Sequence, residues 1–411
     1  MKNKLWTKDY TMLTIGATIS YMGNSTMSFV LSLLVLDIFD SLLLYSAYLI
    51  LYKISKLLVP SLIGPYIENK KKSNIISICD LCSSIVYIGY FFALKSTTYS
   101  TIIIFIGAIF LGAIDSIHRV AYKALIPSIV SKEQLSKSYS VTSFLDNASS
   151  FMMLVASILY EYVGTRIIFL IGAILFFLSA LIESVIKEEK SKLNNSDSIK
   201  KYVTELKEGF SYVYNNKALY LICIFYFIHY IQIGTMDTLW LPYYKSLDEY
   251  GYYLYFIVGG ANLSGSSLAS FFMYKFKINE KWRYKIAIVC CAFVALAIGT
   301  TLAIPWYIGM CLMYISGICT EINNNIYESS TYTTLDESQR ARYSGIYTTC
   351  TNLGTLVGTL FAGLLSEYLG VKNTNLLFGI IAFISIKIIF LGKYKKEIKK
   401  LFNLEGVDYE L

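Results

Sequence analysis

The sequence predicts an all-α polytopic membrane protein with twelve transmembrane helices in two pseudo-symmetric bundles of six. Three observations predict this fold class. The 411-residue chain is 55% hydrophobic and only 16% charged, with a mean hydropathy of +0.53, whereas soluble domains carry about 25% charged residues. Long apolar segments recur along its length, and a motif from the first half of the chain returns in the second half.

Each predicted span is an apolar stretch long enough to cross the bilayer. A transmembrane helix takes about 20 predominantly apolar residues. Stretches such as "TIIIFIGAIFLGAI" lack the strict alternation of a barrel strand, so helices are favoured. The predicted spans are residues 10–36, 41–67, 75–94, 100–126, 140–162, 166–186, 218–241, 251–274, 286–304, 307–327, 344–366 and 374–392.

One long polar segment divides the spans into two sets of six. Its second part has apolar residues spaced four, three, four and three apart, which predicts an amphipathic helix along the membrane surface. These apolar residues are Ile199, Val203, Leu206, Phe210 and Val213. The predicted domains are an N-terminal bundle (1–186), a cytoplasmic linker (187–217), a C-terminal bundle (218–392) and a cytoplasmic tail (393–411).

Basic residues are distributed unevenly between the two sides of the predicted membrane. With the N-terminus inside, 27 of the 36 Lys and Arg residues lie in cytoplasmic segments and 4 lie in external ones. Because positive charge is retained on the cytoplasmic side, we expect both termini in the cytoplasm and the chain in a bacterial cytoplasmic membrane. The net charge of +8 therefore reflects topology, and we predict no nucleic-acid partner.

Cysteine and glycine motifs inside the spans predict packing. All eight cysteines fall within predicted spans, which argues against a disulfide framework. Cys79 and Cys82 have CxxC spacing, but no second ligand pair accompanies them, so packing is favoured over metal or redox chemistry. The glycines of "GGANLSGSS" and "GTLVG" predict close helix–helix contacts.

A repeat relates the two halves of the chain. The fifth span ends in "SILYEYVG", and the eleventh ends in "GLLSEYLG" 206 residues later. The same offset aligns Asp115 with Glu321 and His118 with Asn324, so an acid recurs at equivalent places in spans four and ten. Two repeated halves of six spans are typical of secondary transporters.

Three segments between the predicted spans carry a resemblance to a known family: "GPYIENKKK" after span two, "YKALIPSIVSKEQL" after span four and "ELKEGFSYVYNNKAL" before span seven. They resemble segments of the major facilitator superfamily, in the branch that includes macrolide-efflux proteins and siderophore exporters. The resemblance covers nearly the whole chain and implies a rocker-switch carrier whose spans 1, 4, 7 and 10 line a central cavity. It also implies that the loop after span two stabilises a cytoplasmic gate through Gly64, Glu68, Lys71 and Lys72. The alternative for the lysines is that they serve only to keep this loop on the cytoplasmic side.

Ionisable side chains inside the spans are the main candidates for function, because charges in a membrane are costly unless they are functional or paired. We expect Asp115 and Glu321 to carry a proton whose release is coupled to transport, or to attract a cationic substrate. The candidate proton-coupling and cavity residues are Asp115, Glu321, His229, His118, Arg119, Asn324, Asn24, Gln232, Asp237, Lys53 and Lys56.

Several candidates have a structural alternative. Asp115 and Arg119 are four residues apart on one helix face, and Lys56 matches Asp115 in depth, so internal ion pairs are the alternative to proton coupling. Lys53 and Lys56 could instead form an anion site for acidic substrates. A lone histidine in a membrane helix is often a hydrogen-bonded core residue, which is the alternative for both histidines.

We therefore predict a proton-coupled antiporter that exports an amphipathic small molecule, such as a drug or secondary metabolite, by alternating access. Export follows from the resemblance alone, and import on the same fold is the alternative. A sensor or an intramembrane enzyme is more remote, since neither HExxH nor GxSxG occurs. We expect a monomer in the lipid bilayer, with a small-molecule substrate and with the proton gradient in place of any cofactor or metal.

Overall fold

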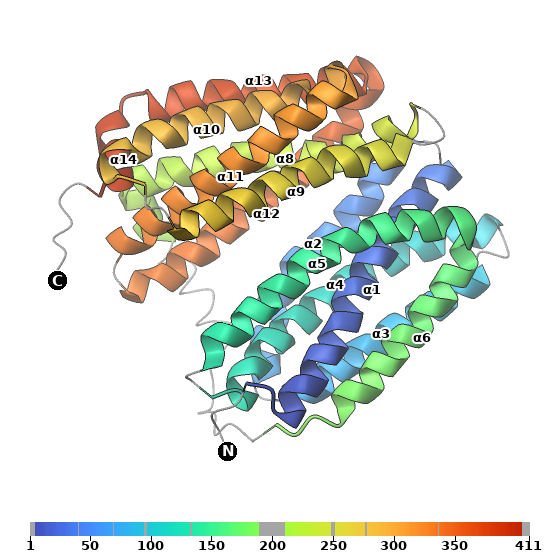
Figure 1. Cartoon of the computed structure of the whole chain (residues 1–411). Coiled ribbons are helices and arrows are strands. Elements are labelled where there is room, and N and C mark those ends of the chain that lie inside the picture. Colours follow the sequence, from blue (N-terminus) through green and yellow to red (C-terminus); the bar gives the residue numbers. More distant parts are fainter. Residues whose placement is uncertain are drawn as a thin grey trace. The chain divides into compact units, whose positions relative to one another are not determined.

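The computed structural model describes the chain in nine stretches. They are residues 5–39, 41–68, 70–93, 97–131, 134–188, 210–247, 251–275, 278–335 and 337–404. Within these stretches the regular structure is helical, and a long helix lies at the position of each of the twelve predicted spans (Figure 1). Most of the predicted linker lies outside the described residues, but 210–215 are helical. The chain divides into two compact units, Met1–Ile199 and Lys200–Leu411.

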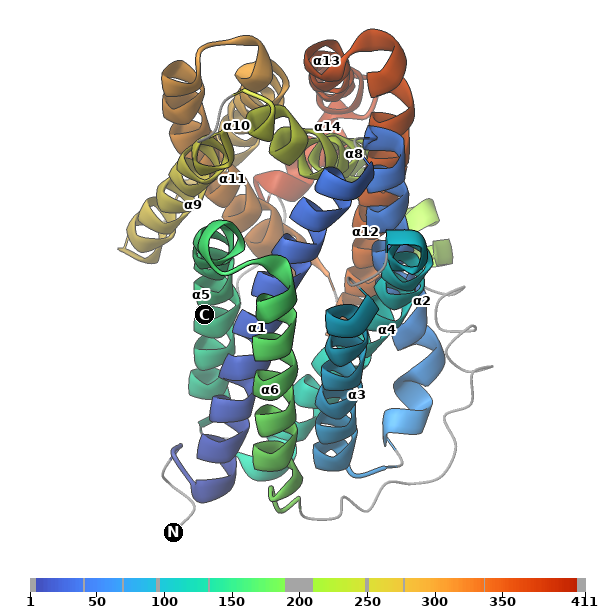
Figure 2. The same ribbon diagram turned by 90° about the vertical axis from the view of Figure 1, so that its right-hand side faces the viewer.

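Unit 1 contains the first six long helices. They are α1 (Lys8–Phe39), α2 (Leu42–Glu68), α3 (Lys72–Ala93), α4 (Thr97–Ile129), α5 (Leu135–Tyr162) and α6 (Thr165–Ser184). Helix α1 packs on α5 and α6, α3 packs on α4 and α6, and α2 packs on α4 (Figure 2). Part of the core lies where Tyr21 of α1 meets Tyr122 of α4, with ring centroids 5.7 Å apart.

Unit 2 repeats this arrangement. Its helices are α8 (Lys217–Lys245), α9 (Gly251–Lys275), α10 (Glu280–Thr300), η2 (Thr301–Ala303), α11 (Trp306–Thr334), α12 (Glu337–Leu369), α13 (Val371–Phe390) and α14 (Lys395–Phe402). The pairs α8/α12, α8/α13, α10/α11, α10/α13 and α9/α11 correspond to the five pairs of unit 1. Adding 206 to the bounds of the first six helices gives those of α8 to α13 to within four residues.

Ten helices in the described part of the chain are long and apolar enough to cross a membrane. The two predicted spans outside this set are α5 and α11. Helix α11 carries Glu321 and three consecutive asparagines, which lower its hydropathy. The chain is an all-α, multi-pass membrane protein, as the sequence predicts.

Glycines allow close helix contacts in unit 2. A Cβ atom on Gly358 of α12 would collide with the carbonyl oxygen of Ile231 on α8. A Cβ atom on Gly265 of α9 would collide with the carbonyl oxygen of Tyr314 on α11. These glycines belong to "GTLVG" and "GGANLSGSS", so the packing prediction is confirmed for them. It is not confirmed for Gly259 and Gly260 of the second motif, where no described atom lies within 4 Å of an added Cβ.

Replacing Gly358 by alanine is expected to lower stability, because overpacking a helix contact costs about 1–3 kcal/mol. The matched control is Gly345→Ala on the same helix, where no described atom lies within 4 Å of an added Cβ. Alanine at that exposed position should add up to about 1 kcal/mol of helix propensity. Thermal unfolding of the purified proteins in detergent measures both effects. Equal shifts for the two variants would contradict a close contact at Gly358.

The segment after the last span contains a further ordered helix. Helix α14 buries its apolar face, including Phe402, in the core of unit 2. Asn403 Oδ1 accepts a hydrogen bond from the N–H of Tyr284 at 3.1 Å, and the Ser330 hydroxyl donates to the Phe402 carbonyl at 2.9 Å. The predicted tail, residues 393–411, is therefore packed on unit 2 as far as residue 404.

Candidate functional site

Helices α2 and α4 of unit 1 are joined by a network of charges around Asp115. This carboxylate is only 4% exposed, and Lys56 Nζ lies 2.6 Å from its Oδ2. Arg119 Nε donates to Oδ1 at 3.1 Å, and the Tyr52 hydroxyl donates to Oδ2 at 3.3 Å. The predicted ion pairs of Asp115 with Lys56 and Arg119 are confirmed, and both oxygens of the carboxylate are occupied.

Helical spacing explains how this network forms. Asp115 and Arg119 are four residues apart on α4, and Tyr52 and Lys56 are four apart on α2, so each pair lies on one face. The Arg119 guanidinium also lies 4.8 Å from the ring centroid of Tyr21 on α1. Lys56 is 39% exposed and Arg119 is 33% exposed. Two partly exposed cations therefore share one buried anion.

His118 lies in a separate, buried cluster of unit 1. Its Nε2 is 3.6 Å from Asp80 Oδ1 on α3 and 3.6 Å from Glu183 Oε1 on α6. None of the three side chains is more than 3% exposed. Because N–H···O hydrogen bonds span about 2.7–3.2 Å, neither contact is a hydrogen bond. Asp80 and Glu183 are site residues that the sequence pattern does not single out.

A small cavity of about 140 Å³ in unit 2 lies between α8, α10 and α11. His229 and Asn324, two predicted site residues, both line it. The His229 ring stacks on Phe225, with centroids 6.0 Å apart. Asn323, which also lines the cavity, donates from Nδ2 to the Tyr226 hydroxyl at 3.0 Å. The cavity therefore offers aromatic faces, an imidazole and amide groups.

One face of α11 is polar and is not covered by the rest of unit 2. Glu321 is half-buried, whereas Asn324, Asn325 and Glu328 are exposed. These residues follow Glu321 by three, four and seven positions, so they share its face of the helix. No ion pair of Glu321 is recorded among the described residues, unlike that of its counterpart Asp115.

The exposed face of α13 gives a comparison within the same unit. It presents Ile380, Ile384 and Ile388, which suit a surface against lipid. Carboxylates and amides are costly in lipid, and such groups in membrane helices face protein or a water-filled space. The polar face of α11 therefore indicates an aqueous surrounding for Glu321.

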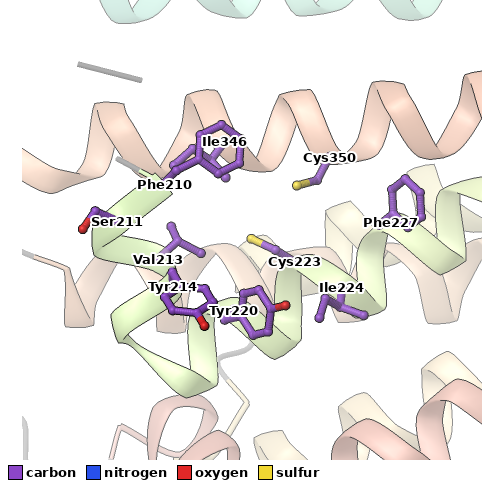
Figure 3. Close-up of a pocket in the computed structure, with 10 residues that line it drawn as sticks. All are labelled: Phe210, Ser211, Val213, Tyr214, Tyr220, Cys223, Ile224, Phe227, Ile346 and Cys350. Atoms are coloured by element: carbon purple, nitrogen blue, oxygen red, sulfur yellow. The ribbon is translucent and has the colours of Figure 1, made fainter. Parts of the chain in front are cut away.

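A larger cavity of about 430 Å³ lies near the start of α8. Phe210 and Tyr214 of the helical segment 210–215 contribute to its lining, as does Ile346 of α12 (Figure 3). Cys223 of α8 and Cys350 of α12 point their thiols toward one another beside it (Figure 3). The lining is aromatic and aliphatic, so this cavity suits an apolar group.

The other predicted cavity residues occupy separate positions. Gln232 is buried, and its Nε2 donates to the Ala295 carbonyl at 2.7 Å, so this side chain joins α8 to α10. Asn24 of α1 and Lys53 of α2 are half-buried, and Asp237 of α8 is exposed.

The predicted gate loop is shorter than expected. The resemblance implies that Gly64 and Glu68 belong to the loop after span two, but both lie in α2, which ends at Glu68, one residue beyond the predicted span of 41–67. Only a short connection through the exposed Lys71 precedes α3. Lys72, the first residue of α3, is buried, and its Nζ lies 3.2 Å from Glu188 Oε1.

Comparison with protein families identifies the chain. The sequence model of the Major Facilitator Superfamily matches residues 13–335 and 277–406 in two overlapping stretches. The chain belongs to the Major Facilitator Superfamily. No curated protein sequence matches it.

Solved structures share this Major Facilitator Superfamily fold at low sequence identity. A mutant form of the nucleoside transporter NupG has a TM-score of 0.70 and 13% identity, covering 94% of this chain and 99% of that one. A bacterial homologue of the iron transporter ferroportin, in an inward-facing state, has a TM-score of 0.67 and 16% identity, covering 92% and 97%. A bacterial homologue of the human lysosomal transporter Spinster has a TM-score of 0.65 and 12% identity, covering 98% of both chains. These likenesses establish the fold, and with the family they indicate a transporter rather than an enzyme.

Proposed function

We propose that this chain is a proton-coupled exporter of an amphipathic small molecule, such as a drug or secondary metabolite, in a bacterial cytoplasmic membrane. The observation that carries the proposal is the polar face of α11. Glu321 lies on it without a recorded cationic partner among the described residues. A carboxylate beside water can bind and release a proton during each transport cycle, whereas Asp115 already has a partner on each oxygen.

The two acids therefore have different roles. Glu321 exchanges the coupling proton, and Asp115 connects α2 to α4 through Lys56. The cavity at His229 receives the polar or aromatic part of the substrate, because it presents amides and ring faces. The larger apolar cavity receives an aliphatic or aromatic part. The resemblance to macrolide-efflux proteins and siderophore exporters supports export.

A second candidate is transport of an anionic molecule. Lys56 and Arg119 are both partly exposed and lie beside the same carboxylate, so this network presents two cationic side chains within one small region of unit 1. A carboxylate or phosphate group on a substrate would complement that charge. Testing both amphipathic and anionic compounds in the susceptibility panel described next separates these two substrate classes.

A susceptibility panel in cells lacking and cells overproducing the protein tests direction and substrate class together. Overproduction is expected to raise the inhibitory concentration of exported amphipathic compounds, and deletion is expected to lower it. The compound with the largest shift is then tested in proteoliposomes, where its movement should be accompanied by proton flux. Resistance that rises on deletion would indicate import. Substrate movement without proton flux would refute the coupling, and a sensor or an enzyme would move neither.

A further inference from the structure

We propose that Asp80, His118 and Glu183 bind one divalent metal ion, such as Mn²⁺ or Zn²⁺, inside unit 1. The three residues come from α3, α4 and α6. One ligand atom from each lies within 4.8 Å of the other two. The sequence alone does not indicate this site, because its ligands are far apart along the chain.

The distances fit a metal ion better than a hydrogen bond. His118 Nε2 is 3.6 Å from one oxygen of each carboxylate, too far for a hydrogen bond to either. Ligand atoms with this separation can surround a single ion at about 2.1 Å, the usual length of metal–nitrogen and metal–oxygen bonds to zinc. One imidazole with two carboxylates is a donor set that suits Mn²⁺ or Zn²⁺.

The burial of these side chains leaves coordinating atoms without partners. Among the described residues, His118 Nε2 and both carboxylate oxygens of Glu183 make no hydrogen bond. Glu183 is 0% exposed, and Asp80 is 1% exposed. Two buried carboxylates and a neutral imidazole carry a charge of about −2, which a divalent ion would neutralise. A single protonated histidine would leave one buried negative charge uncompensated.

The surroundings position the ligands. The Ser20 hydroxyl of α1 donates to Asp80 Oδ2, so the other carboxylate oxygen is left to face His118. This is the usual arrangement in which an outer hydrogen bond orients a metal ligand. Gly16 makes room for Glu183, because a Cβ at that position would lie 2.6 Å from the glutamate Cγ.

Unit 2 shows that the fold itself does not require these acids. At the offset of 206 residues, Asp80 corresponds to Ile286 and Glu183 corresponds to Ile389. Ile389 is 5% exposed and belongs to the core of unit 2. The same helix contacts are therefore made with apolar side chains in one unit and with acids in the other. An ion held by the acids would tie α3, α4 and α6 together.

The test measures metal binding by the full chain, purified in detergent without a polyhistidine tag. After chelator treatment, the protein is incubated with Mn²⁺ or Zn²⁺, and the metal retained through gel filtration is determined by mass spectrometry. We expect about one ion per chain for the wild type and a raised unfolding temperature. His118→Gln should weaken binding at least about tenfold. The matched control, His229→Gln, removes the other histidine, and this variant should retain as much metal as the wild type.

A second variant avoids leaving a buried charge unpaired. The second variant combines Asp80→Ile, Glu183→Ile and His118→Asn. Each change introduces the residue that unit 2 carries at the corresponding position. This triple variant is expected to fold and to retain no metal. Wild-type protein that retains neither ion and shows no metal-dependent rise in unfolding temperature would overturn the proposal. So would equal metal retention by the wild type and the triple variant.

Discussion

Replacing Glu321 by glutamine is expected to reduce proton-driven substrate accumulation at least about tenfold, a loss of about 1.4 kcal/mol or more of coupling free energy. Glutamine keeps the size and polarity of the side chain on the uncovered face of α11. Its amide does not ionise as a carboxylate does, so it cannot bind and release the coupling proton. Substrate exchange at equal pH on both sides does not need net proton movement, so it should persist. Proteoliposomes with and without an imposed pH gradient measure the two activities separately.

The matched control is Glu367→Gln, which removes an exposed carboxylate near the end of α12. This variant should accumulate substrate as the wild type does. Full gradient-driven accumulation by Glu321→Gln would remove Glu321 from the coupling mechanism. Equal loss of accumulation and of exchange would instead place Glu321 in substrate binding.

The pair Lys56 and Asp115 is expected to show strong coupling in a double-mutant cycle. Lys56→Met leaves the buried Asp115 with one cation fewer, and Asp115→Asn leaves two neighbouring cations without their anion. Removing one partner of a buried ion pair can cost about 3–5 kcal/mol, and the partial exposure of Lys56 makes the lower end of this range appropriate. The double variant should recover about 0.5–3 kcal/mol relative to the sum of the single variants.

Unfolding temperature and folded yield of the four proteins measure this coupling. A parallel cycle with Lys123→Met serves as control, because Lys123 lies on α4 but is exposed. That cycle should be additive. Equal defects of Lys56→Met in the presence and absence of the Asp115 carboxylate would reject the ion pair as an energetic unit.

The fold was predictable because membrane insertion is decided locally. A span of about 20 apolar residues is recognisable without its neighbours, and the position of every predicted span corresponds to a helix. Departures occur where a helix continues beyond its predicted span, as α2 does by one residue at Glu68. Helix α14 is not predicted because it is only 8 residues long and mostly charged, so it has no apolar stretch long enough to be a span.

The contacts of the candidate site were predictable only where two residues lie on one face of the same helix, or at the same depth in two different spans. Asp115 and Arg119 are four residues apart, and Lys56 lies at the same depth on α2, so their network could be anticipated. The cluster at His118 could not, because Asp80 and Glu183 come from two other helices. Asp80 stands out in the sequence only as part of the "CDLC" motif, and Glu183 lies in the last turn of α6, where a polar residue normally marks the membrane surface.

The constant spacing between the two units has a consequence for the history of the protein. Helix α6 begins and ends 206 residues before α13, and the other five pairs keep this spacing to within four residues. A duplicated gene whose halves diverged by substitution, with few insertions or deletions in the helices, would leave this record. Asp80 and Glu183 on one side, and Ile286 and Ile389 on the other, would then be alternative outcomes at the same ancestral positions. Helices α6 and α13 have the same length and equivalent bounds, so exchanging one for the other would leave the number of residues in the connecting loops unchanged.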